Sequence, residues 1–297
     1  MSQMIRRCVI VGGTGGIGGM FATLLAEAGV EVCLIDQNYL IVNFELLQCD
    51  ITSPTPAAIS VIRMADMVIL ALPERVAMNA LAIVSNLMKP ESLLAHTLSV
   101  QLPIATKIDY LGISLEVVGL NPMFAPNLSI VGRPVAAIIH NEGPRVAELL
   151  QLLSDVGARV VRIDAEEHDQ LVAAMQALTH ASIISFGLAL STLNVDIAKL
   201  SLLAPPPHST MLALLARISS GTPEVYWDVQ TANQQASMAR IALVNAIHRL
   251  NALTTNESAL DDFIDLLSET REVLGNEITS YQDLCALIFN GSQSATQ

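Results

Sequence analysis

The chain has 297 residues, of which 52% are hydrophobic and 14% are charged, so it can build a large core and has a length typical of two domains. Its net charge of −13 excludes the basic surface with which proteins bind nucleic acid or an anionic membrane, although an acidic protein can still hold a locally basic site. The four cysteines form no C-x-x-C pair, so we expect reduced thiols in a cytoplasmic protein, with neither a disulfide framework nor a metal site.

Short apolar runs alternate with helical segments over residues 1–164. The run "RCVIVGG" (7–13) predicts a strand, residues 16–28 predict a helix, and "VEVCLID" (30–36) predicts a second strand. Further strands are predicted in "MADMVILALP", "SLLAHTLSV", "LEVVGLNP" and "PVAAIIH", and "GPRVAELLQLLSDVGARVVRID" predicts a helix followed by a strand. This alternation predicts an α/β domain of the Rossmann type, with a doubly wound parallel sheet.

Residues 165–297 have a different, all-helical pattern. The segment "EEHDQLVAAMQALTHASIISFGLAL" has apolar residues at helical spacing and no glycine or proline before Gly187, and helical patterns recur at 210–220, 225–253 and 257–289. His168 and Asp169 start the first of these helices, and we expect them to cap it and anchor the domain junction. No apolar run reaches the ~20 residues that span a bilayer, and "ASIISFGLALSTL" (181–193), which comes nearest, predicts a buried helix.

A glycine-rich segment, "VIVGGTGGIGG", follows the first strand and opens the first helix. Gly13, Gly15 and Gly18 fit the pattern G-x-G-x-x-G, in which the first glycine allows a tight turn and the second lets the backbone approach a pyrophosphate. The third glycine permits close packing of helix on strand, and the helix N-terminus faces the phosphates. We therefore expect this loop, including Gly16 and Ile17, to bind a dinucleotide; a glycine-rich turn without a ligand is the alternative.

Asp36 ends the second predicted strand, 18 residues after Gly18. A carboxylate at that place can accept a hydrogen bond from a ribose 2′-hydroxyl and repels a 2′-phosphate, so the sequence favours NAD over NADP. Leu72 and Pro73, in "ILALP", end another predicted strand, where a cofactor would lie along the sheet. The same apolar run could also be part of the core.

The order of several motifs carries a resemblance. The segments "VIVGGTGGIGG", "MVILALP", "LSVQ", "GLNPMFAP", "EEHDQLVAAMQALTH" and "ARISSGTPEVYWDV" follow one another from about residue 8 to residue 280. In this order they resemble the prephenate dehydrogenase family. The resemblance implies a Rossmann domain followed by a helical domain that forms a homodimer, and NAD(P)-dependent oxidation and decarboxylation of a cyclohexadiene substrate.

The resemblance also implies roles for single residues. Ser99, in "LSVQ", matches a serine that contacts the substrate near the nicotinamide, and His180 matches a histidine of the substrate site. Arg217 matches the arginine that binds a substrate carboxylate, and Tyr226 matches an aromatic residue close to the site. Gln176 precedes His180 by one helical turn, so the two would share a face.

The residues alone leave other interpretations open. Without the resemblance, His180 would be read as a core histidine, Tyr226 as a core aromatic residue and Gln176 as a polar residue at a helix edge. Ser99 carries no signal by itself. Arg217 is more informative, because it lies in an apolar segment of a chain with only 15 basic residues, so it either faces the surface or binds an anion.

One position departs from the family pattern. The family motif is G-x-H-P-M-F-G, whose histidine accepts the proton of the substrate 4-hydroxyl; here the motif is "GLNPMFA", with Asn121 in place of the histidine. Gln101 stands where the family has a lysine, and Asn127 where it often has an acidic residue. A general base contributes roughly 10²–10⁴-fold in rate, and an amide cannot accept a proton at neutral pH.

A substrate that bears an amine instead of the hydroxyl removes the need for the base. The neutral amine already has the electron pair that drives hydride transfer, and Asn121 can accept its hydrogen bond. A histidinium would repel an ammonium, so the exchange of histidine for asparagine also favours the amino substrate over the hydroxyl one. The sequence therefore suggests the branch of the family that converts 4-amino-4-deoxyprephenate to 4-aminophenylpyruvate, a step toward 4-aminophenylalanine and antibiotics built from it.

Three alternatives stay open. One is a prephenate or arogenate dehydrogenase of tyrosine biosynthesis, with His180 or a water molecule as base. A second is a non-catalytic NAD-binding pseudoenzyme, although such a scaffold would not need Ser99, Gln176, His180 and Arg217 together. A third is a β-hydroxyacid dehydrogenase or imine reductase; those enzymes use a lysine or aspartate in the first interdomain helix, and "QLVAAMQALTH" has no lysine.

Overall fold

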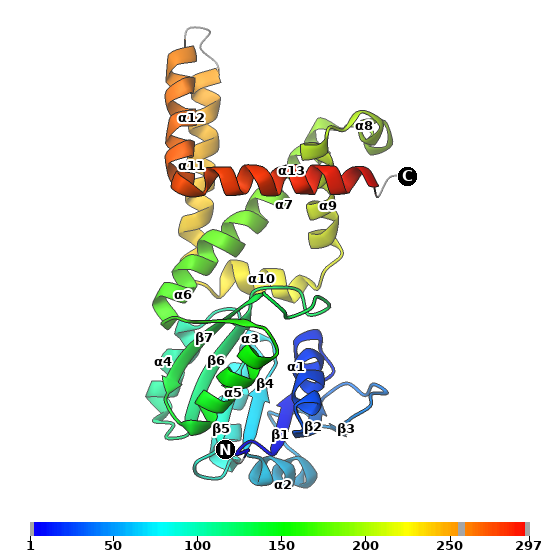
Figure 1. Ribbon diagram of the computed structural model, residues 1–297, viewed down its shortest axis with the longest axis vertical. Helices are drawn as coiled ribbons and strands as arrows, with labels where there is room; N and C mark the ends of the chain where they lie inside the picture. The colour runs from blue at the N-terminus through cyan, green and yellow to red at the C-terminus, as the bar shows by residue number, and fades with distance from the viewer. Residues whose placement is uncertain (1–2, 255–258, 295–297) are drawn as a thin grey trace. The chain divides into compact units, whose positions relative to one another are not determined.

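The structure is a computed structural model that describes residues 3–254 and 259–294 (Figure 1). The chain divides into two compact units, Met1–Val172 and Ala173–Gln297. The division falls after the helix α6 (Ala165–Val172), so this helix groups with the sheet, whereas the sequence predicts a boundary at 164/165, before the helix.

The first unit contains one eight-stranded sheet with the order β3-β2-β1-β4-β5-β6-β7-β8. Its strands are β1 (Arg7–Val11), β2 (Glu31–Asp36), β3 (Glu45–Gln48), β4 (Met67–Leu70), β5 (Leu93–His96), β6 (Glu116–Pro122), β7 (Pro134–Asn141) and β8 (Arg159–Arg162). The predicted doubly wound sheet is confirmed, with strand order reversing between β1 and β4. The sequence did not predict β3, a short edge strand with the sequence ELLQ.

The pairing of β6 with β7 departs from the prediction of a fully parallel sheet, because these two strands run antiparallel. Their connection, residues 123–133, contains no helix. Parallel neighbours need a crossover of about a dozen residues or more, usually a helix, so this loop returns the chain in the opposite direction. The helix α5 (Pro144–Asp155) then supplies a crossover, and β8 pairs parallel with β7.

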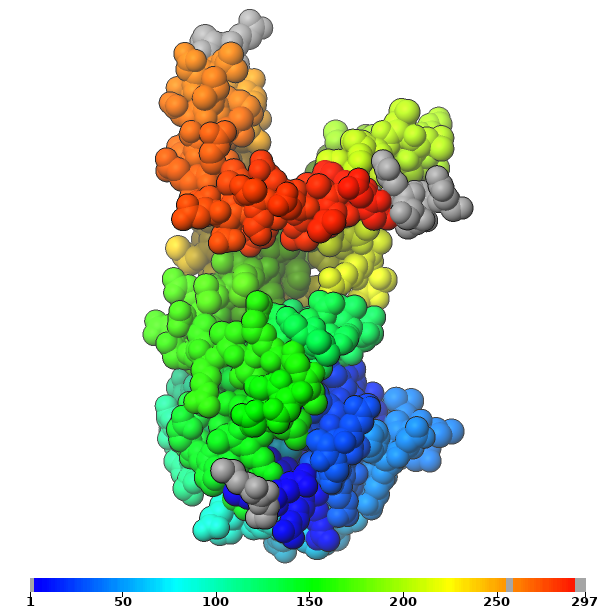
Figure 2. Space-filling view, in the orientation of Figure 1, coloured from blue at the N-terminus to red at the C-terminus, as the bar shows by residue number. Residues whose placement is uncertain are grey.

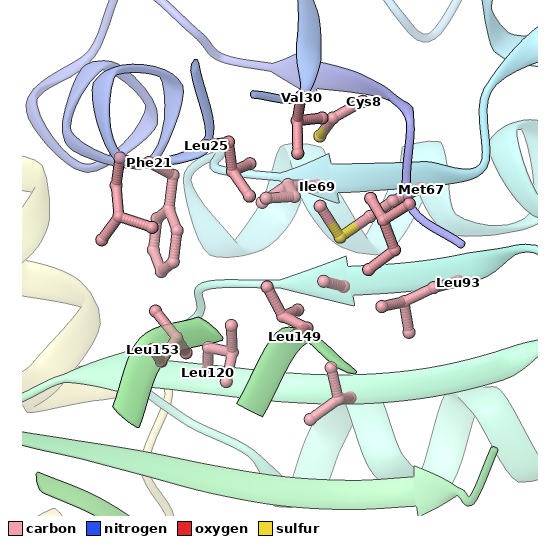
Figure 3. Close-up of a cluster of buried hydrophobic side chains, with 14 of the residues drawn as sticks. Cys8, Phe21, Leu25, Val30, Met67, Ile69, Leu93, Leu120, Leu149 and Leu153 are labelled. Carbon is pink, nitrogen blue, oxygen red and sulfur yellow. The ribbon is translucent and has the colours of Figure 1, made fainter. Parts of the chain in front are cut away.

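Both faces of the sheet are buried, which explains why its central strands are continuous apolar runs. On β1, Ile10 belongs to a core cluster with α1 (Gly16–Glu27) and α5, whereas Val9 belongs to a second cluster with α2 (Pro56–Met64), α3 (Glu74–Leu87) and α4 (Leu102–Leu111). Figure 3 shows the first cluster, in which Phe21 of α1 and Leu153 of α5 point toward the strands. Truncation of one such buried aromatic to alanine costs about 3–5 kcal/mol, so this core fixes the strand ends that carry the site.

The second unit is helical throughout its described residues, as predicted. Its elements are the π-helix η1 (Ala173–Leu178), α7 (Thr179–Leu193), α8 (Ile197–Leu203), α9 (Pro206–Ser219), α10 (Pro223–Thr231), α11 (Ala236–Thr254), α12 (Leu260–Leu274), the 3₁₀ turn η2 (Gly275–Glu277) and α13 (Ile278–Ser294). The helical patterns at 225–253 and 257–289 each break once, at residues 232–235 and at Gly275; residues 257–258 lie outside the described residues. Helices α11 and α12 lie side by side (Figures 1 and 2), joined by an ion pair between Arg249 and Glu269.

Many apolar side chains of the helical unit are exposed in the single chain. The prediction of a buried helix at 181–193 is wrong for the single chain: Ile183 is the one buried residue of α7, and Leu188 is 65% exposed. By length and composition, one helix could nevertheless cross a membrane, although it contains no uninterrupted apolar run of ~20 residues. The continuous helix Ala165–Leu193 has a mean hydropathy of 1.5 in an 18-residue window, of which 28% is buried. Core helices of soluble proteins also meet this criterion.

Candidate active site

The glycine-rich loop takes its sharp turn at Gly12. This residue has a φ of +81°, and a Cβ there would collide with the carbonyl oxygen of Ala71. The residue in the left-handed conformation is therefore Gly12, which follows β1 directly, and not Gly13. Gly13 instead packs its backbone on the Leu34 side chain. A Cβ on Gly18 would collide with the carbonyl oxygen of Gly12, so a glycine is needed at position 18 for the helix to pack closely on the loop.

A pocket of about 690 Å³ opens beside this loop. Of the predicted cofactor residues, Gly15, Asp36, Leu72 and Pro73 line it. The others, Gly13, Gly16, Ile17 and Gly18, shape the loop and the start of α1 without lining the pocket. The sequence analysis missed the remaining lining residues, which are Val11, Gly12, Thr14, Ile35, Gln37, Asn38, Tyr39, Leu40, Cys49, Asp50, Ile51, Ala71 and Val76.

Asp36 connects the end of β2 to the glycine-rich loop. Its Oδ2 accepts hydrogen bonds from the hydroxyl of Thr14 at 2.6 Å and from the Thr14 backbone N–H at 3.2 Å. Its Oδ1 accepts one from the backbone N–H of Asn38 at 3.0 Å. The carboxylate is thus held in place, with acceptor capacity left on the pocket side.

The charge of the pocket suits a ribose that carries no 2′-phosphate. Two carboxylates, those of Asp36 and Asp50, line it, and its described lining contains no lysine, arginine or histidine. A 2′-phosphate would lie among negative charges without a cation to pair with. The glycine-rich loop, the fixed carboxylate of Asp36 and the volume of the pocket together fit NAD.

Asn121 lies near the end of β6 and is 4% exposed. Its Nδ2 lies 3.1 Å from Nε2 of His168, and Nδ1 of His168 lies 2.8 Å from Oδ1 of Asp169. All three side chains are almost completely buried. The position that departs from the family pattern is therefore the end of a buried Asp–His–Asn chain.

Asp169 also holds the start of α4. Its Oδ1 accepts a hydrogen bond from the backbone N–H of Gln101 at 2.8 Å, and its Oδ2 accepts one from the N–H of Leu102 at 2.9 Å. These are unsatisfied donors of a helix N-terminus, which a carboxylate complements. The expected capping role of Asp169 is thus found on a different helix, because α6 brings it next to the loop that contains Ser99.

The loop between β5 and α4 contains Ser99 and Gln101. Ser99 is half-buried in this loop, and β5 runs parallel to β6, so Ser99, just beyond β5, and Asn121, near the end of β6, lie toward the carboxyl ends of neighbouring strands. Gln101 is fully buried, and its Nε2 donates to the Leu98 carbonyl at 2.6 Å. A Cβ on Gly119 would collide with Oε1 of Gln101, so the glycine of "GLNP" is required by packing.

A second histidine lies under this loop. His96, at the end of β5, is fully buried, and its Nε2 lies 3.2 Å from Nε2 of His140. Burial lowers the pKa of His96 well below its usual value, and His140 and His168 lower it further. His96 is therefore neutral at neutral pH and adds no charge beneath the Asp–His–Asn chain.

In the helical unit, three of the predicted residues form one cluster. The rings of His180 and Tyr226 meet edge to face with centroids 5.0 Å apart. Burial, and then the positive charge of Arg217, lower the pKa of His180. A Cβ on Gly221 would lie 2.6 Å from the Tyr226 ring, so this glycine lets the ring pack on the backbone. The cluster offers a cation, a neutral imidazole and a phenol, which can bind a carboxylate-bearing ligand.

Gln176 lies in the π-helix η1, which the sequence did not predict. In a π-helix the hydrogen bonds span five residues, so a spacing of four residues is still close to one turn, and the shared face of Gln176 and His180 stays a prediction. The carbonyl of Ala177 accepts a hydrogen bond from Nε2 of Gln230 at 2.9 Å, and Gln230 is held in turn by Arg240. This contact satisfies a backbone group of η1 from α10.

The functional candidates that the sequence analysis missed are Gly12, Thr14 and His168. Gly12 has a visible signal, because it is the first residue after the apolar run of β1. His168 has a weaker one: a histidine beside an aspartate at the start of a long apolar helix, a pattern that by itself predicts a cap and an anchor. Its contact with Asn121 joins residues 47 positions apart, and sequence patterns carry no such information.

Comparison with known proteins agrees with this architecture. Residues 164–277 match the family model "Prephenate dehydrogenase, dimerization domain". A 4-amino-4-deoxyprephenate dehydrogenase of Streptomyces pristinaespiralis is 44% identical over 285 residues, which cover 95% of this chain and 96% of that protein. A probable arogenate/prephenate dehydrogenase of Methanocaldococcus jannaschii is 26% identical over 274 residues, covering 90% of this chain and 61% of that protein.

Among solved structures, the fold is similar to that of a prephenate dehydrogenase from A. aeolicus in complex with hydroxyphenyl propionate and NAD⁺. That structure has a TM-score of 0.70 and 18% sequence identity, and the similarity covers 92% of this chain and 100% of the other. The predicted fold class, a Rossmann-type domain followed by a helical domain, is therefore confirmed. The identity with the Streptomyces protein over almost the whole of both chains shows the family. This chain belongs to the prephenate dehydrogenase family.

Proposed function

We propose that this protein is an NAD-dependent dehydrogenase that oxidises and decarboxylates 4-amino-4-deoxyprephenate to 4-aminophenylpyruvate and carbon dioxide. The observation that carries the proposal is Asn121, a neutral amide at the end of β6 where the family motif has a histidine. The 4-amino-4-deoxyprephenate dehydrogenase that is 44% identical supports it. NAD, held by the glycine-rich loop and Asp36, supplies the hydride acceptor.

The chemistry of the amine explains why an amide suffices at this position. As hydride leaves the ring carbon that bears nitrogen, the nitrogen lone pair forms a C=N bond and the group becomes an iminium. Loss of carbon dioxide from the ring then supplies the electron pair that aromatises it, and the nitrogen becomes an aromatic amine. The nitrogen needs no deprotonation before hydride transfer, so Asn121 acts as a hydrogen-bond acceptor and not as a base.

The remaining predicted residues receive binding roles in this proposal. Arg217 pairs with a carboxylate of the substrate, since a guanidinium can form two parallel hydrogen bonds to one carboxylate. His180 is uncharged at neutral pH, because burial and Arg217 lower its pKa, so it offers one donor and one acceptor. Ser99, Gln176 and Tyr226 complete the contacts with the substrate.

A second candidate function has one specific observation in its favour. His168 lies against Asn121 and is paired with Asp169, so the chain holds a histidine–aspartate pair close to the position of the missing base. If this pair can take the proton of a hydroxyl through a small movement, the protein acts on prephenate or arogenate in tyrosine biosynthesis.

We also infer that the protein is a homodimer in the cytoplasm. The match to a dimerization domain supports the dimer, and so do four half-exposed apolar side chains on α11, which are Ile241, Val244, Ile247 and Leu250. The four free cysteines and the use of NAD support a reducing, cytoplasmic location. Light scattering of the purified protein is expected to give a particle of two chains.

The test of the catalytic proposal compares two substrates. The purified protein is mixed with NAD and either 4-amino-4-deoxyprephenate or prephenate, and NADH absorbance is followed while the product is identified by mass. Rapid NADH formation with the amino compound and little with prephenate is the expected result. The reverse preference would assign the protein to tyrosine biosynthesis, and no NADH from either would make it a non-catalytic NAD-binding protein.

A further inference from the structure

We propose that His168 and Asp169 fix the side-chain amide of Asn121 in one orientation, with its Oδ1 directed to the substrate amine. His168 and Asp169 are thus positioning residues that act through Asn121. This inference rests on the proposed function, since it concerns how the same site selects an amine.

The argument begins at the backbone of α4. Two N–H groups, those of Gln101 and Leu102, donate to the two carboxylate oxygens of Asp169 at 2.8 and 2.9 Å. Both oxygens therefore act as acceptors. Because Oδ1 also lies 2.8 Å from Nδ1 of His168, the proton of this hydrogen bond belongs to the imidazole.

The protonated Nδ1 determines what the other ring nitrogen does. A neutral imidazole with its proton on Nδ1 has a lone pair on Nε2, which can only accept a hydrogen bond. The Asn121 side chain meets this lone pair at 3.1 Å, so it must present its NH₂ group there. The oxygen and nitrogen of an amide are distinguished by such a network, and with a neutral imidazole the network leaves one arrangement.

Burial makes the arrangement strict. The exposed fractions of Asn121, His168 and Asp169 are 4%, 2% and 4%. With the amide reversed, Oδ1 would face the lone pair of Nε2, and no water could separate the two acceptors or satisfy them. Oδ1 of Asn121 has no hydrogen-bond partner among the described residues, so it remains available to a ligand.

The orientation selects for nitrogen in the transition state. An amine that is becoming an iminium gains positive charge, so its N–H bond to Oδ1 strengthens as hydride leaves. A hydroxyl on the same carbon must lose its proton, and the developing oxyanion would face the negative end of the amide dipole. The same contact therefore favours one substrate and opposes the other.

The test is a double-mutant cycle with 4-amino-4-deoxyprephenate and NAD. We expect His168→Phe to lower kcat roughly ten- to hundred-fold, more than it raises KM, because a lost partner of a buried polar group acts on the transition state. In the Asn121→Ala background the same change is expected to have little further effect. If the two losses multiply, His168 does not act through Asn121 and the inference is overturned.

A spectroscopic measurement keeps the inference testable without activity. A long-range ¹H–¹⁵N spectrum separates protonated from bare histidine nitrogens, and the His168 signals are identified by their absence from His168→Gln. We expect a protonated Nδ1 and a bare Nε2; a protonated Nε2 would overturn the inference. This readout holds even if His168→Phe fails to fold.

The two proposals fail in different ways. If wild-type protein forms no NADH with the amino compound, the proposed function fails, whereas the histidine spectrum still decides the amide orientation. If wild-type protein is active and the cycle shows no coupling, only the positioning role fails. His140→Phe removes another histidine of the sheet unit, one that is half-buried, and serves as the control, with kcat expected to stay near that of wild type.

Discussion

Nδ2 of Asn121 lies 3.1 Å from Nε2 of His168, and neither side chain is more than 4% exposed. A polar pair at this depth needs hydrogen-bond partners, and Asp169, itself bonded to the start of α4, supplies one to His168. The asparagine is therefore built into its surroundings and is not an isolated replacement of a histidine.

Replacement of Asn121 by histidine is expected to raise turnover of prephenate and to lower turnover of the amino compound. A base beside the hydroxyl contributes roughly 10²–10⁴-fold, although His168 occupies the neighbouring space and will hold the gain near the lower end. The measurement is the initial rate of NADH formation with each substrate. Unchanged rates with both would show that Asn121 does not select the substrate.

Gly12→Ala is expected to abolish NAD binding and to destabilise the sheet unit. The residue has a φ of +81° and its Cβ would collide with the Ala71 carbonyl, so both strain and overlap act. Gly29→Ala is the matched control, because Gly29 has a φ of +82° with nothing within 4 Å of the added Cβ. The control should lose about 1–2 kcal/mol of unfolding free energy and retain NAD. If chemical denaturation showed equal losses of unfolding free energy for Gly12→Ala and Gly29→Ala, the collision at Gly12 would be contradicted.

Asp36→Ser is expected to weaken NAD binding roughly tenfold or more and to weaken NADP binding less, so that the preference for NAD over NADP falls. The substitution removes the acceptor for the ribose and the repulsion of a 2′-phosphate. Dissociation constants of both cofactors are measured by titration of the protein. Asp50→Asn, also in the pocket lining but with its carboxylate turned to Thr52, should change the NAD:NADP ratio less. An unchanged ratio in Asp36→Ser would refute the assignment.

Arg217→Lys is expected to raise KM for the amino substrate roughly ten- to hundred-fold, because a lysine cannot form the two parallel hydrogen bonds of a guanidinium. The dissociation constant for NAD should stay the same, since Arg217 belongs to the helical unit and the predicted NAD site to the sheet unit. Steady-state kinetics and cofactor titration separate the two effects. A loss confined to NAD binding would place Arg217 elsewhere than in the substrate site.

The stability of the protein should fall as pH decreases below about 6.5. Burial lowers the pKa of His96, His140 and His180 in the folded chain, so the unfolded chain binds more protons as pH falls from the unfolded value through the folded one. Each such histidine contributes a slope of up to about 1.4 kcal/mol per pH unit. Urea unfolding at several pH values measures this slope, and His96→Leu should reduce it. A free energy of unfolding that rises on acidification would contradict the sign.

The sheet unit could be predicted well from its sequence because its central strands are apolar on both faces and are punctuated by glycine and proline. The failures occur where local pattern ends. The strand β3 is short and half-buried, and the antiparallel direction of β7 depends on a loop without a helix. The sequence placed the tight turn at Gly13, one residue after its position at Gly12, because the two successive glycines fit the same pattern.

The helical unit shows a different limit of sequence analysis. Its apolar periodicity predicted helices correctly but also predicted that they would be buried, and Leu188 and Leu193 are more than half exposed in the single chain. Apolar periodicity indicates that one face of a helix is shielded from water, but it does not indicate whether the same chain or another chain covers that face. The roles of Ser99, Gln176, His180, Arg217 and Tyr226 stay predictions.

The link from Asp36 to Thr14 has a consequence for how this family member can change over time. The carboxylate that meets the ribose also holds the hydroxyl and the backbone N–H of Thr14, within the glycine-rich loop. A substitution that altered cofactor choice would at the same moment loosen the loop that every dinucleotide must use. A change of cofactor therefore passes through a poorer enzyme unless Thr14 changes as well, and the present choice is protected against drift by single substitutions.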